Sequence, residues 1–276
     1  MNKLIVINET FFFHPKLIEK LCETYGDQIK GVFLVTRTSS KVSLNSFLIK
    51  NIFKLHLSEI LILATINFIY FIKDILFKYF SLGKPVSVRS VLKKNNISII
   101  NVKNSLNSDS LVEYISKNNI HIVLSSNPLY FGHKYLKLKK IVFLNRHSSY
   151  LPHNGGVLPV FYSVSKKMNF IGATIHLISN KIDAGNIIHQ EKIIHTSCNL
   201  YDLYEKCFDL SYDLILKSFE TIENNFDYYT NYNPYLVNKI QYHTFPKKND
   251  WRKFRENSGK FVKLKNLINL ILNKNI

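Results

Sequence analysis

The sequence has few residues that could crosslink the chain, and it lacks a recognisable secretion signal. Its three cysteines are an odd number without the spacing of a metal site or a disulfide framework, and they stand at Cys22, Cys198 and Cys207. We interpret them as small buried apolar residues in a reducing compartment. The N-terminus, MNKLIVINETFFFHP, enters an apolar strand pattern directly, without the regions of a signal peptide. The chain is therefore expected to be cytoplasmic.

Arginine is also scarce, although the chain is strongly basic. Lysine and arginine number 37 against 19 acidic residues, a net charge of +18, yet only five of the basic residues are arginines, namely Arg37, Arg89, Arg146, Arg252 and Arg255. Geometric recognition of phosphates and bases relies on the bidentate fork of arginine. No nucleic-acid reader motif is present, so the charge favours an anionic small substrate, and nucleic acid stays a weaker alternative partner.

Long apolar runs are rare, and the most apolar one is Ile60–Ile72, in which only Thr65 and Asn67 are polar. This run is too short to cross a ~30 Å hydrocarbon core comfortably, and charged residues flank it closely. We expect a buried helix here. A helix on a membrane surface is the alternative, so peripheral membrane contact stays among the candidate interactions, and a true span is the least favoured reading.

Strand-like and helix-like patterns alternate up to about residue 195. Strands are predicted at Leu4–Ile7, Gly31–Val35, Ile97–Val102, Ile120–Leu124 and Ile141–Leu144, and helices at about 15–25, at about 43–80 and after a Ser108 N-cap, where Leu111, Val112 and Ile115 form the apolar stripe. This alternation predicts an α/β fold, a Rossmann-like, open, mostly parallel sheet with helices on both faces. In such sheets, ligands bind beyond the carboxyl ends of the strands.

Two more strands are expected at Gly172–Leu177 and Ile187–Ile194, with Asp183 and Gly185 in the turn between them, and a helix from Leu200 to about 224 follows. The character of the sequence changes after this helix. We therefore expect a catalytic domain at residues 1–226, with a helical insertion at about 43–80, and a small C-terminal appended segment at residues 227–276.

Asn145 and His147 stand where the strand that begins at Ile141 gives way to a loop rich in Ser, Pro and Gly. An amide NH₂ and an imidazole that converge supply the two donors required by an oxygen that becomes negative during a reaction. A carboxylate that orients the histidine would complete such a site. Asp183 is the candidate, with an ordinary turn aspartate as the alternative.

The order of these motifs resembles that of the folate-dependent formyltransferases, which include glycinamide ribonucleotide, methionyl-tRNA and nucleotide-sugar formyltransferases. The resemblance covers roughly residues 120–195 and rests on four motifs: Asn145, His147, Ser149, Leu151 and Pro152; Gly156 and Pro159; Gly172, Thr174 and His176; and Asp183, Gly185, Ile187 and Ile188. Gly155, Arg146 and Tyr150 depart from the family pattern. These departures affect contacts with the cofactor tail and the substrate.

The resemblance implies that Asn145, His147 and Asp183 are the catalytic residues, acting on 10-formyltetrahydrofolate as the formyl donor without a metal. Asn145 and His147 would hold the oxyanion that forms when a neutral amine attacks the formyl carbon. Asp183 would orient His147 and, through a water, accept a proton. The resemblance also places the cofactor against Leu129, Tyr130, Phe131, Pro152 and Gly156, although the aromatic residues could equally be core. His176 could be a packed core histidine.

The resemblance further suggests which amine is formylated. The stretch after Asp227 is too short for the C-terminal barrel of methionyl-tRNA formyltransferases. We therefore expect a nucleotide-linked amino sugar of surface polysaccharide synthesis as the substrate, with methionyl-tRNA as the alternative. A homodimer stays open. Two non-enzymatic alternatives also remain, a basic nucleic-acid-binding protein and a membrane-surface scaffold built on Ile60–Ile72 and the lysine-rich C-terminus.

Overall fold

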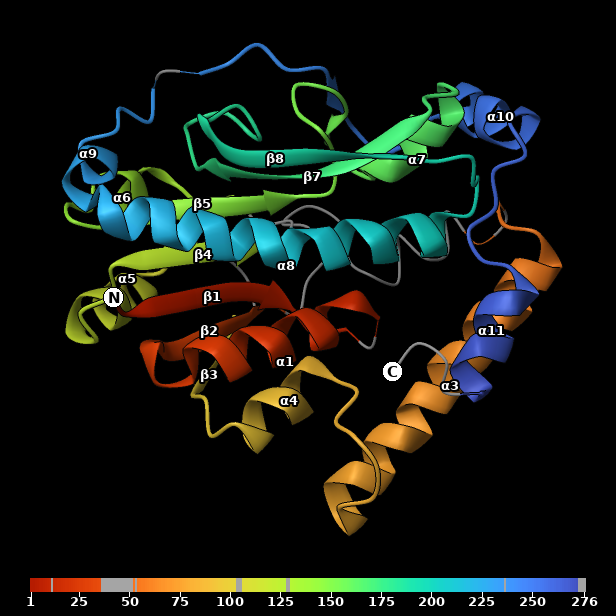
Figure 1. Cartoon of the computed structure of the whole chain (residues 1–276), viewed down its shortest axis with the longest axis horizontal. Coiled ribbons are helices and arrows are strands. Elements are labelled where there is room, and N and C mark those ends of the chain that lie inside the picture. The colour runs from red at the N-terminus through yellow and green to blue at the C-terminus, as the bar shows by residue number, and fades with distance from the viewer. Residues whose placement is uncertain are drawn as a thin grey trace.

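A seven-stranded sheet forms the centre of the molecule (Figure 1), in a computed structural model that describes residues 1–10, 12–35, 52, 54–102, 106–127, 130–235 and 237–272. The strand order is β3 (Ile99–Val102), β2 (Ile29–Val35), β1 (Lys3–Asn8), β4 (Ile122–Ser126), β5 (Val142–His147), β7 (Phe170–Leu177) and β8 (Ile187–Ile194). The first five of these run parallel, whereas β7 is antiparallel to β5 and β8 is antiparallel to β7. The predicted mostly parallel α/β sheet is confirmed.

Helices cover both faces of the sheet because its inner strands are apolar on both sides. In β1, Ile5 and Ile7 belong to the core beneath α1 (Phe13–Tyr25), α4 (Val88–Lys94) and α8 (Leu200–Asn224). Leu4 and Val6 point to the opposite core, beneath α5 (Asp109–Lys117) and α6 (His133–Leu136). Successive strand residues face opposite sides of a sheet, and two such layers bury a continuous apolar run.

The predicted elements are found with small shifts at their ends. β5 does not stop at Leu144 but continues through His147, so that Asn145 lies on the strand itself. Ser108 occupies the N-cap position of α5, but its hydroxyl contacts the hydroxyl of Ser110 and makes no side-chain bond to the helix backbone. Residues 43–51 and 53 of the expected helical insertion lie outside the described residues.

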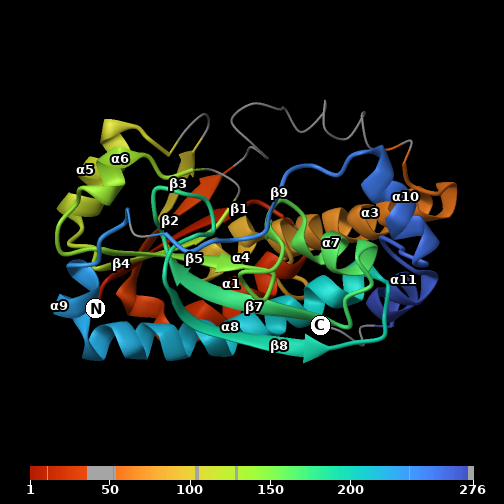
Figure 2. The same ribbon diagram turned by 90° about the horizontal axis from the view of Figure 1, so that it is seen from above.

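The segment after α8 runs back along the molecule to the neighbourhood of the sheet and of α3 (Leu57–Phe80), as Figure 2 shows from above. It contains α9 (Phe226–Thr230), β9 (Tyr242–His243), α10 (Lys248–Glu256) and α11 (Leu264–Ile271). β9 pairs with β6 (Gly155–Gly156), α10 packs on α7 (Pro159–Ser165), and α11 packs on α3. The expected division at residue 227 stays a prediction.

The long helix α3 is not the buried helix that Ile60–Ile72 suggested. Its large apolar side chains Leu57, Leu61, Phe68 and Phe71 are exposed, whereas its carboxylates Glu59 and Asp74 are buried. By length and composition alone it could also cross a membrane. The expectation was wrong because burial follows the partners that a helix finds, and α3 meets its neighbours along a single stripe.

A buried ion pair fixes the start of α3 to the C-terminal segment. Both oxygens of Glu59 accept from the guanidinium of Arg255, at 3.0 and 2.6 Å, and they also accept from the backbone N–H groups of His56 and Phe261. Burial alone would raise the pKa of Glu59, but these hydrogen bonds hold it below its ordinary value. Glu59 thus caps its own helix and binds α10 at the same time.

Replacement of Glu59 by Gln should destabilise the protein by about 2 kcal/mol, because Arg255 loses its counter-ion and two charge-assisted hydrogen bonds. For a chain of this size that corresponds to a fall of about 4–8 °C in melting temperature. The pKa of Glu59 is depressed in the folded state, so its stabilisation is present above about pH 4.3 and is lost at lower pH. The difference between the two proteins in a thermal melt should therefore shrink below about pH 4.

Glu256→Gln is the matched control on α10. Glu256 also faces an arginine, Arg252, at 3.7 Å, but both side chains of this pair are exposed. Its melting temperature should change by less than about 1 °C, since exposed ion pairs contribute little. Equal shifts for Glu59→Gln and Glu256→Gln would show that the buried pair contributes no more than a surface pair.

Candidate active site

Successive side chains of β5 point to opposite faces of the sheet, so its three consecutive polar residues are divided between the two faces. Asn145 and His147 share one face, and Arg146 between them points to the other, beneath α8. The spacing Asn-x-His therefore places an amide and an imidazole side by side on a rigid strand. Asn145 is the last β5 residue in the ladder with the parallel neighbour β4, opposite Ser125, and His147 lies beyond that ladder.

Strand β7 supplies a second histidine to this face. His176 lies directly opposite Asn145 in the antiparallel ladder, and Thr174 lies opposite His147. Nδ1 of His176 donates to the carbonyl of Leu177 at 2.9 Å, which leaves Nε2 to accept from the Asn145 amide at 3.2 Å. His176, which the sequence left undecided, therefore belongs to the site.

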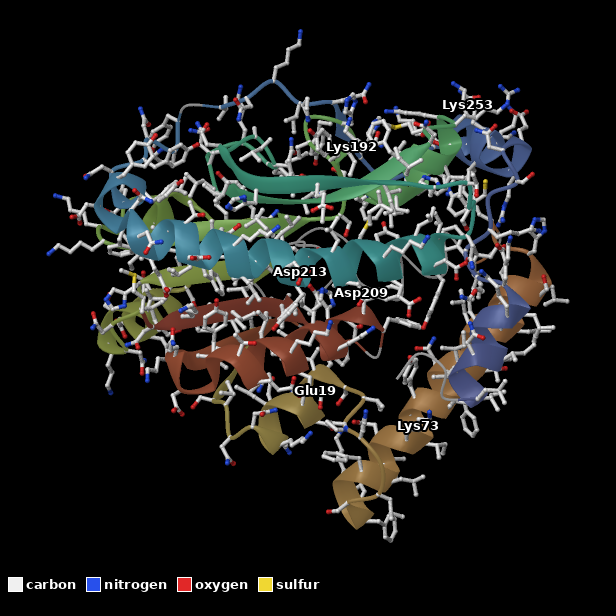
Figure 3. All side chains as sticks on the ribbon, viewed as in Figure 1. Glu19, Lys73, Lys192, Asp209, Asp213 and Lys253 are labelled. Carbon is white, nitrogen blue, oxygen red and sulfur yellow. The ribbon has the colours of Figure 1, made fainter. Side chains whose placement is uncertain are left out.

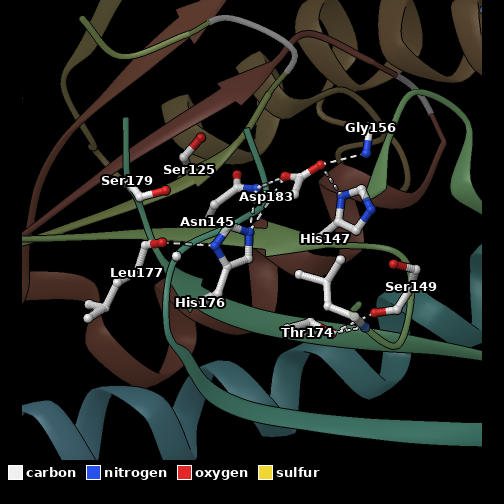
Figure 4. Close-up of polar contacts among 12 residues, drawn as sticks. Ser125, Asn145, His147, Ser149, Gly156, Thr174, His176, Leu177, Ser179 and Asp183 are labelled. Atoms are coloured by element: carbon white, nitrogen blue, oxygen red, sulfur yellow. Dashed lines mark hydrogen bonds and ion pairs between the residues drawn. The ribbon is translucent and has the colours of Figure 1, made fainter. Parts of the chain in front are cut away.

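The turn after β7 carries Asp183 back to these residues (Figure 4). Its carboxylate accepts from the backbone N–H of Gly156 at 2.7 Å and from the Asn145 amide at 3.2 Å. The imidazoles of His147 and His176 each lie 3.6 Å from one of its oxygens. The fold thus brings Asn145 and His147 of one motif together with Asp183 of another, as expected.

Two backbone features hold this arrangement. Asp183 has a φ of 54°, in the left-handed region that costs a non-glycine residue about 1–2 kcal/mol. Gly156 has a φ of 91°, and a Cβ there would collide with the carbonyl oxygen of His243. The close approach of β9 therefore requires a glycine at 156, and the strained backbone at Asp183 carries its carboxylate to the N–H of this glycine.

The buried charges set the ionisation of the cluster. Burial alone would raise the pKa of Asp183, but His147, His176 and the N–H of Gly156 hold it well below its usual range. Burial lowers the pKa of His147, an effect that the charge of Asp183 only partly opposes. At neutral pH the site therefore contains an ionised carboxylate beside a neutral imidazole.

The other nitrogen of His147 is fixed by the loop that follows β5. Nε2 donates to the carbonyl of Asn154 at 3.1 Å, and this leaves Nδ1 facing Asp183. The side chain of Asn154 is fully buried and accepts from Lys166 at 2.9 Å while its amide donates to Ser163 at 2.9 Å. The tautomer of His147 is thus set by a loop residue that is itself anchored on α7 and on Lys166.

The C-terminal segment joins the two loops that meet at Asp183. Gly155 donates to the carbonyl of Gln241 and Val157 to that of His243, both at 2.9 Å. On the other side, the backbone N–H of Asn238 donates to the carbonyl of Ala184 at 2.7 Å. Residues 238–243 therefore support both the loop that contains Gly156 and the loop that contains Asp183. The expectation of a small appended segment did not include this role.

A cleft of about 580 Å³ opens at the cluster, and its lining includes Tyr130, Phe131 and Gly156 of the expected cofactor residues. Phe131 is buried against Tyr135 and Phe143 and is also part of the cleft lining. Pro152 is exposed and outside the lining, where its carbonyl accepts from Gln241. Leu129 lies outside the described residues.

The lining of the cleft also contains a buried cation. Arg146 is 7% exposed, donates to Ser211 at 2.8 Å and to Ser148 at 2.6 Å, and lies over the ring of Phe208. Burial lowers its pKa to about 10, so it is charged at neutral pH. The partners that hold the guanidinium are thus hydroxyls and an aromatic ring.

Sequence reasoning left His176 undecided, missed Asn154, and did not foresee that the backbone N–H of Gly156 donates to Asp183. The position of His176 could have been predicted. In Gly-x-Thr-x-His the threonine and the histidine are two residues apart, so on a strand their side chains point to the same face. The contact between Gly156 and Asp183 had none, since it depends on how two distant loops meet. Among the described residues, no group of three or more His, Cys, Asp or Glu side chains has the arrangement of a metal site.

Comparison with known families agrees with this geometry. Residues 81–217 match the family model described as formyl transferase, a stretch that contains Asn145, His147 and Asp183. Methionyl-tRNA formyltransferase of Prochlorococcus marinus (strain MIT 9215) is 30% identical over 149 residues, and that of Lactobacillus gasseri is 30% identical over 133 residues. These matches cover 54% and 48% of this chain but only 40% and 42% of the relatives, so the chain spans less than half of their length.

Solved structures share the fold over a greater length. A 4-N formyltransferase from Francisella tularensis aligns with a TM-score of 0.52 at 16% identity, covering 93% of this chain and 87% of its own. Phosphoribosylglycinamide formyltransferase from Anaplasma phagocytophilum aligns with a TM-score of 0.55 at 13% identity, covering 82% and 88%. A Mycobacterium tuberculosis protein inferred to be a sugar N-formyltransferase aligns with a TM-score of 0.52 at 15% identity, covering 94% and 88%. The matched stretch includes the strands and the turn that build the cluster around Asp183, and by that match residues 81–217 of the chain belong to the formyl transferase family.

Proposed function

We propose that this protein transfers a formyl group from 10-formyltetrahydrofolate to a primary amine. The observation that carries the proposal is the cluster of Asn145, His147 and Asp183 at the cleft, held by the N–H of Gly156. An amide and an imidazole beside an ionised carboxylate can stabilise a negative oxygen and receive a proton from an amine.

The cleft fits the folate donor in size and in character. Its volume of about 580 Å³ is within the range of pockets that hold small organic ligands. Tyr130, Phe131, Ile178 and Ile182 line it and offer apolar surface to a flat ring. When bound, the folate supplies the formyl group.

The ionisation of each side chain determines its role in oxyanion stabilisation or in proton transfer. Asn145 offers N–H donors to an oxygen whose charge becomes negative, and its two present bonds of 3.2 Å are long enough to be exchanged. Asp183 is a weak base because its pKa lies well below the usual range. His147 is neutral, with Nδ1 toward Asp183, so Nδ1 is the better proton acceptor and Asp183 stabilises the imidazolium that results.

We propose a nucleotide-linked amino sugar as the amine substrate. The fold match to a protein inferred to be a sugar N-formyltransferase extends over nearly the whole chain, whereas the matches to methionyl-tRNA formyltransferases stop at less than half of those proteins. The C-terminal segment wraps around the loops of the site. Methionyl-tRNA is the second candidate, favoured by the 30% identity to those enzymes and by the net charge of +18.

Arg146 is suited to hold the anionic part of such a substrate. It is a buried cation on the cleft wall, and the bonds that fix it leave the charge of the guanidinium without a counter-ion among the partners described above. A phosphate group that entered the cleft would gain a charge-assisted hydrogen bond there.

Removal of any member of the cluster should cut turnover strongly. Asn145→Ala, His147→Ala and Asp183→Asn should each lower kcat by about 10²–10³-fold, because each variant loses a donor or the charge that stabilises imidazolium. Stopped assays with 10-formyltetrahydrofolate would measure this. His189→Ala is the control, since His189 contacts Thr221 away from the cleft, and it should leave kcat unchanged. Full turnover by Asp183→Asn would remove that carboxylate from the mechanism.

A substrate panel separates the two candidate amines. The protein should formylate nucleotide-linked amino sugars and leave methionyl-tRNA unmodified, as measured by mass spectrometry of the products. Modification of the tRNA alone would overturn the proposed substrate while leaving the proposed chemistry intact. A lack of formyl transfer to either class under conditions where folate binds would contradict both.

Substitution of Arg146 should affect substrate binding more than chemistry. Arg146→Gln should raise KM for a phosphate-bearing substrate by about 10–100-fold, because one charge-assisted contact is lost, with a smaller effect on kcat. Arg146→Lys should recover part of the loss by restoring charge without the planar fork. An unchanged KM in a folded Arg146→Gln protein would assign the arginine to packing against Phe208.

A further inference from the structure

The polar and apolar side chains of helix α3 are distributed in the opposite way to those of a helix that faces water. Its two carboxylates point inward, where Glu59 pairs with Arg255 and Asp74 accepts from Ser87 and Ser90 at 2.8 and 2.6 Å. Its outward face consists mainly of large apolar side chains, among them Leu57 at 71% exposed and Phe68 at 63% exposed. A surface helix normally places polar residues outward. The outward face of α3 is therefore matched to an apolar surrounding.

Helix α11 extends this apolar face. Leu267 and Leu270 of α11 pack with Ile66 of α3, while Leu264, Ile268 and Ile271 remain exposed beside it. The two helices lie side by side at one end of the molecule, away from the sheet (Figure 1). We call the exposed apolar residues of α3 and α11 the α3–α11 face. A contiguous apolar surface of this kind marks an interaction site.

The charge around the α3–α11 face is predominantly positive. Residues 54–84 contain four lysines and two acids, Glu59 and Asp74, both of which are buried; Asp74 pairs with Lys78. Residues 257–272 contain three lysines and no acid, and one of these lysines, Lys265, pairs with Asp202 of α8. Figure 3 shows Lys73 on α3 among the side chains that extend from this helix. Lysines at the border of an apolar face can extend their charged ends toward anionic headgroups while the stems remain on apolar surface.

Both ends of α3 are fastened to the same body, which decides how the helix can meet a membrane. Its start is tied to α10 through Glu59 and Arg255, and its last turns are tied to α4 through Asp74, Ser87 and Ser90. A helix of this length, about 36 Å, could cross a bilayer only with its ends on opposite sides. The fold therefore allows α3 to lie along a membrane surface and opposes a span.

A second copy of the chain fits the same face less well. A two-fold contact through the α3–α11 face would bring its lysines near those of the partner, without an exposed acid in residues 54–84 or 257–272 to pair with them. Anionic lipid headgroups provide the missing countercharge. The charge pattern therefore favours a lipid surface over self-association.

We propose that the α3–α11 face binds the surface of an anionic lipid bilayer, with the apolar side chains in the boundary between headgroups and acyl chains and the lysines in the headgroup layer. Such binding places the catalytic cleft near a membrane without a spanning segment. Phe12 connects the two regions, since its ring contacts Tyr70 of α3 and also lines the cleft.

Vesicle flotation with the full chain tests this proposal. The protein should bind vesicles of phosphatidylcholine that contain about one third phosphatidylglycerol, and it should bind pure phosphatidylcholine at least ~10-fold more weakly. Raising the salt concentration should weaken binding to the anionic vesicles. The double variant Phe68→Asp/Phe71→Asp should lose at least ~10-fold in affinity for them, with an unchanged melting temperature because both residues are exposed.

Ile194→Asp is the matched control, because Ile194 is equally apolar and 67% exposed but lies on β8. It should bind vesicles as the native sequence does. The proposal is overturned if the native protein fails to bind anionic vesicles, or if Phe68→Asp/Phe71→Asp binds as tightly as the native protein. A lipid-independent dimer that this double variant dissociates, measured by analytical ultracentrifugation, would assign the face to a second copy and overturn the proposal as well.

Discussion

The carboxylate of Asp183 is the point at which separate parts of the chain meet. It accepts from the loop after β5 through Gly156, from β5 itself through Asn145, and it faces the histidines of β5 and β7. A buried carboxylate is costly unless such partners surround it. Its position therefore depends on the register between β5 and β7 and on the close approach of the two loops. The strain at Asp183 is tolerated because these contacts determine where the residue must lie.

The site is supported from a direction that a parallel α/β sheet alone does not provide. The segment at residues 238–243 hydrogen-bonds both to the loop that contains Gly156 and to the loop that contains Asp183, and the chain then continues to α10 and α11. Glu59 and Arg255 join α10 to α3. The loops of the candidate site and the proposed lipid-binding face thus belong to one continuous set of contacts, and Phe12 forms a second, shorter connection between them.

The sequence predicted the sheet and the main site because both follow from local patterns. Strand periodicity located β1 to β5, β7 and β8 closely, and Asn-x-His placed two side chains on one face of β5. The surroundings of α3 could not be read in this way, since an apolar run looks the same whether other helices or lipid cover it. The roles of Asn154 and of residues 238–243 could not be predicted either. Both depend on backbone hydrogen bonds, which almost any residue type can make and which therefore leave no pattern in the sequence. Leu129 lies outside the described residues, and the domain division stays a prediction.

The pairing of β9 with β6 has a consequence for biosynthesis. The cleft is lined both by Asn8 of β1 and by Tyr242, which is translated after all seven strands of the central sheet. While a nascent chain is still being extended through α8, all strands of the central sheet are present, but β6 still lacks its partner strand β9. The complete cleft can therefore form only after β9 has been translated, and it depends on residues that come after the stretch shared with the formyl transferase family.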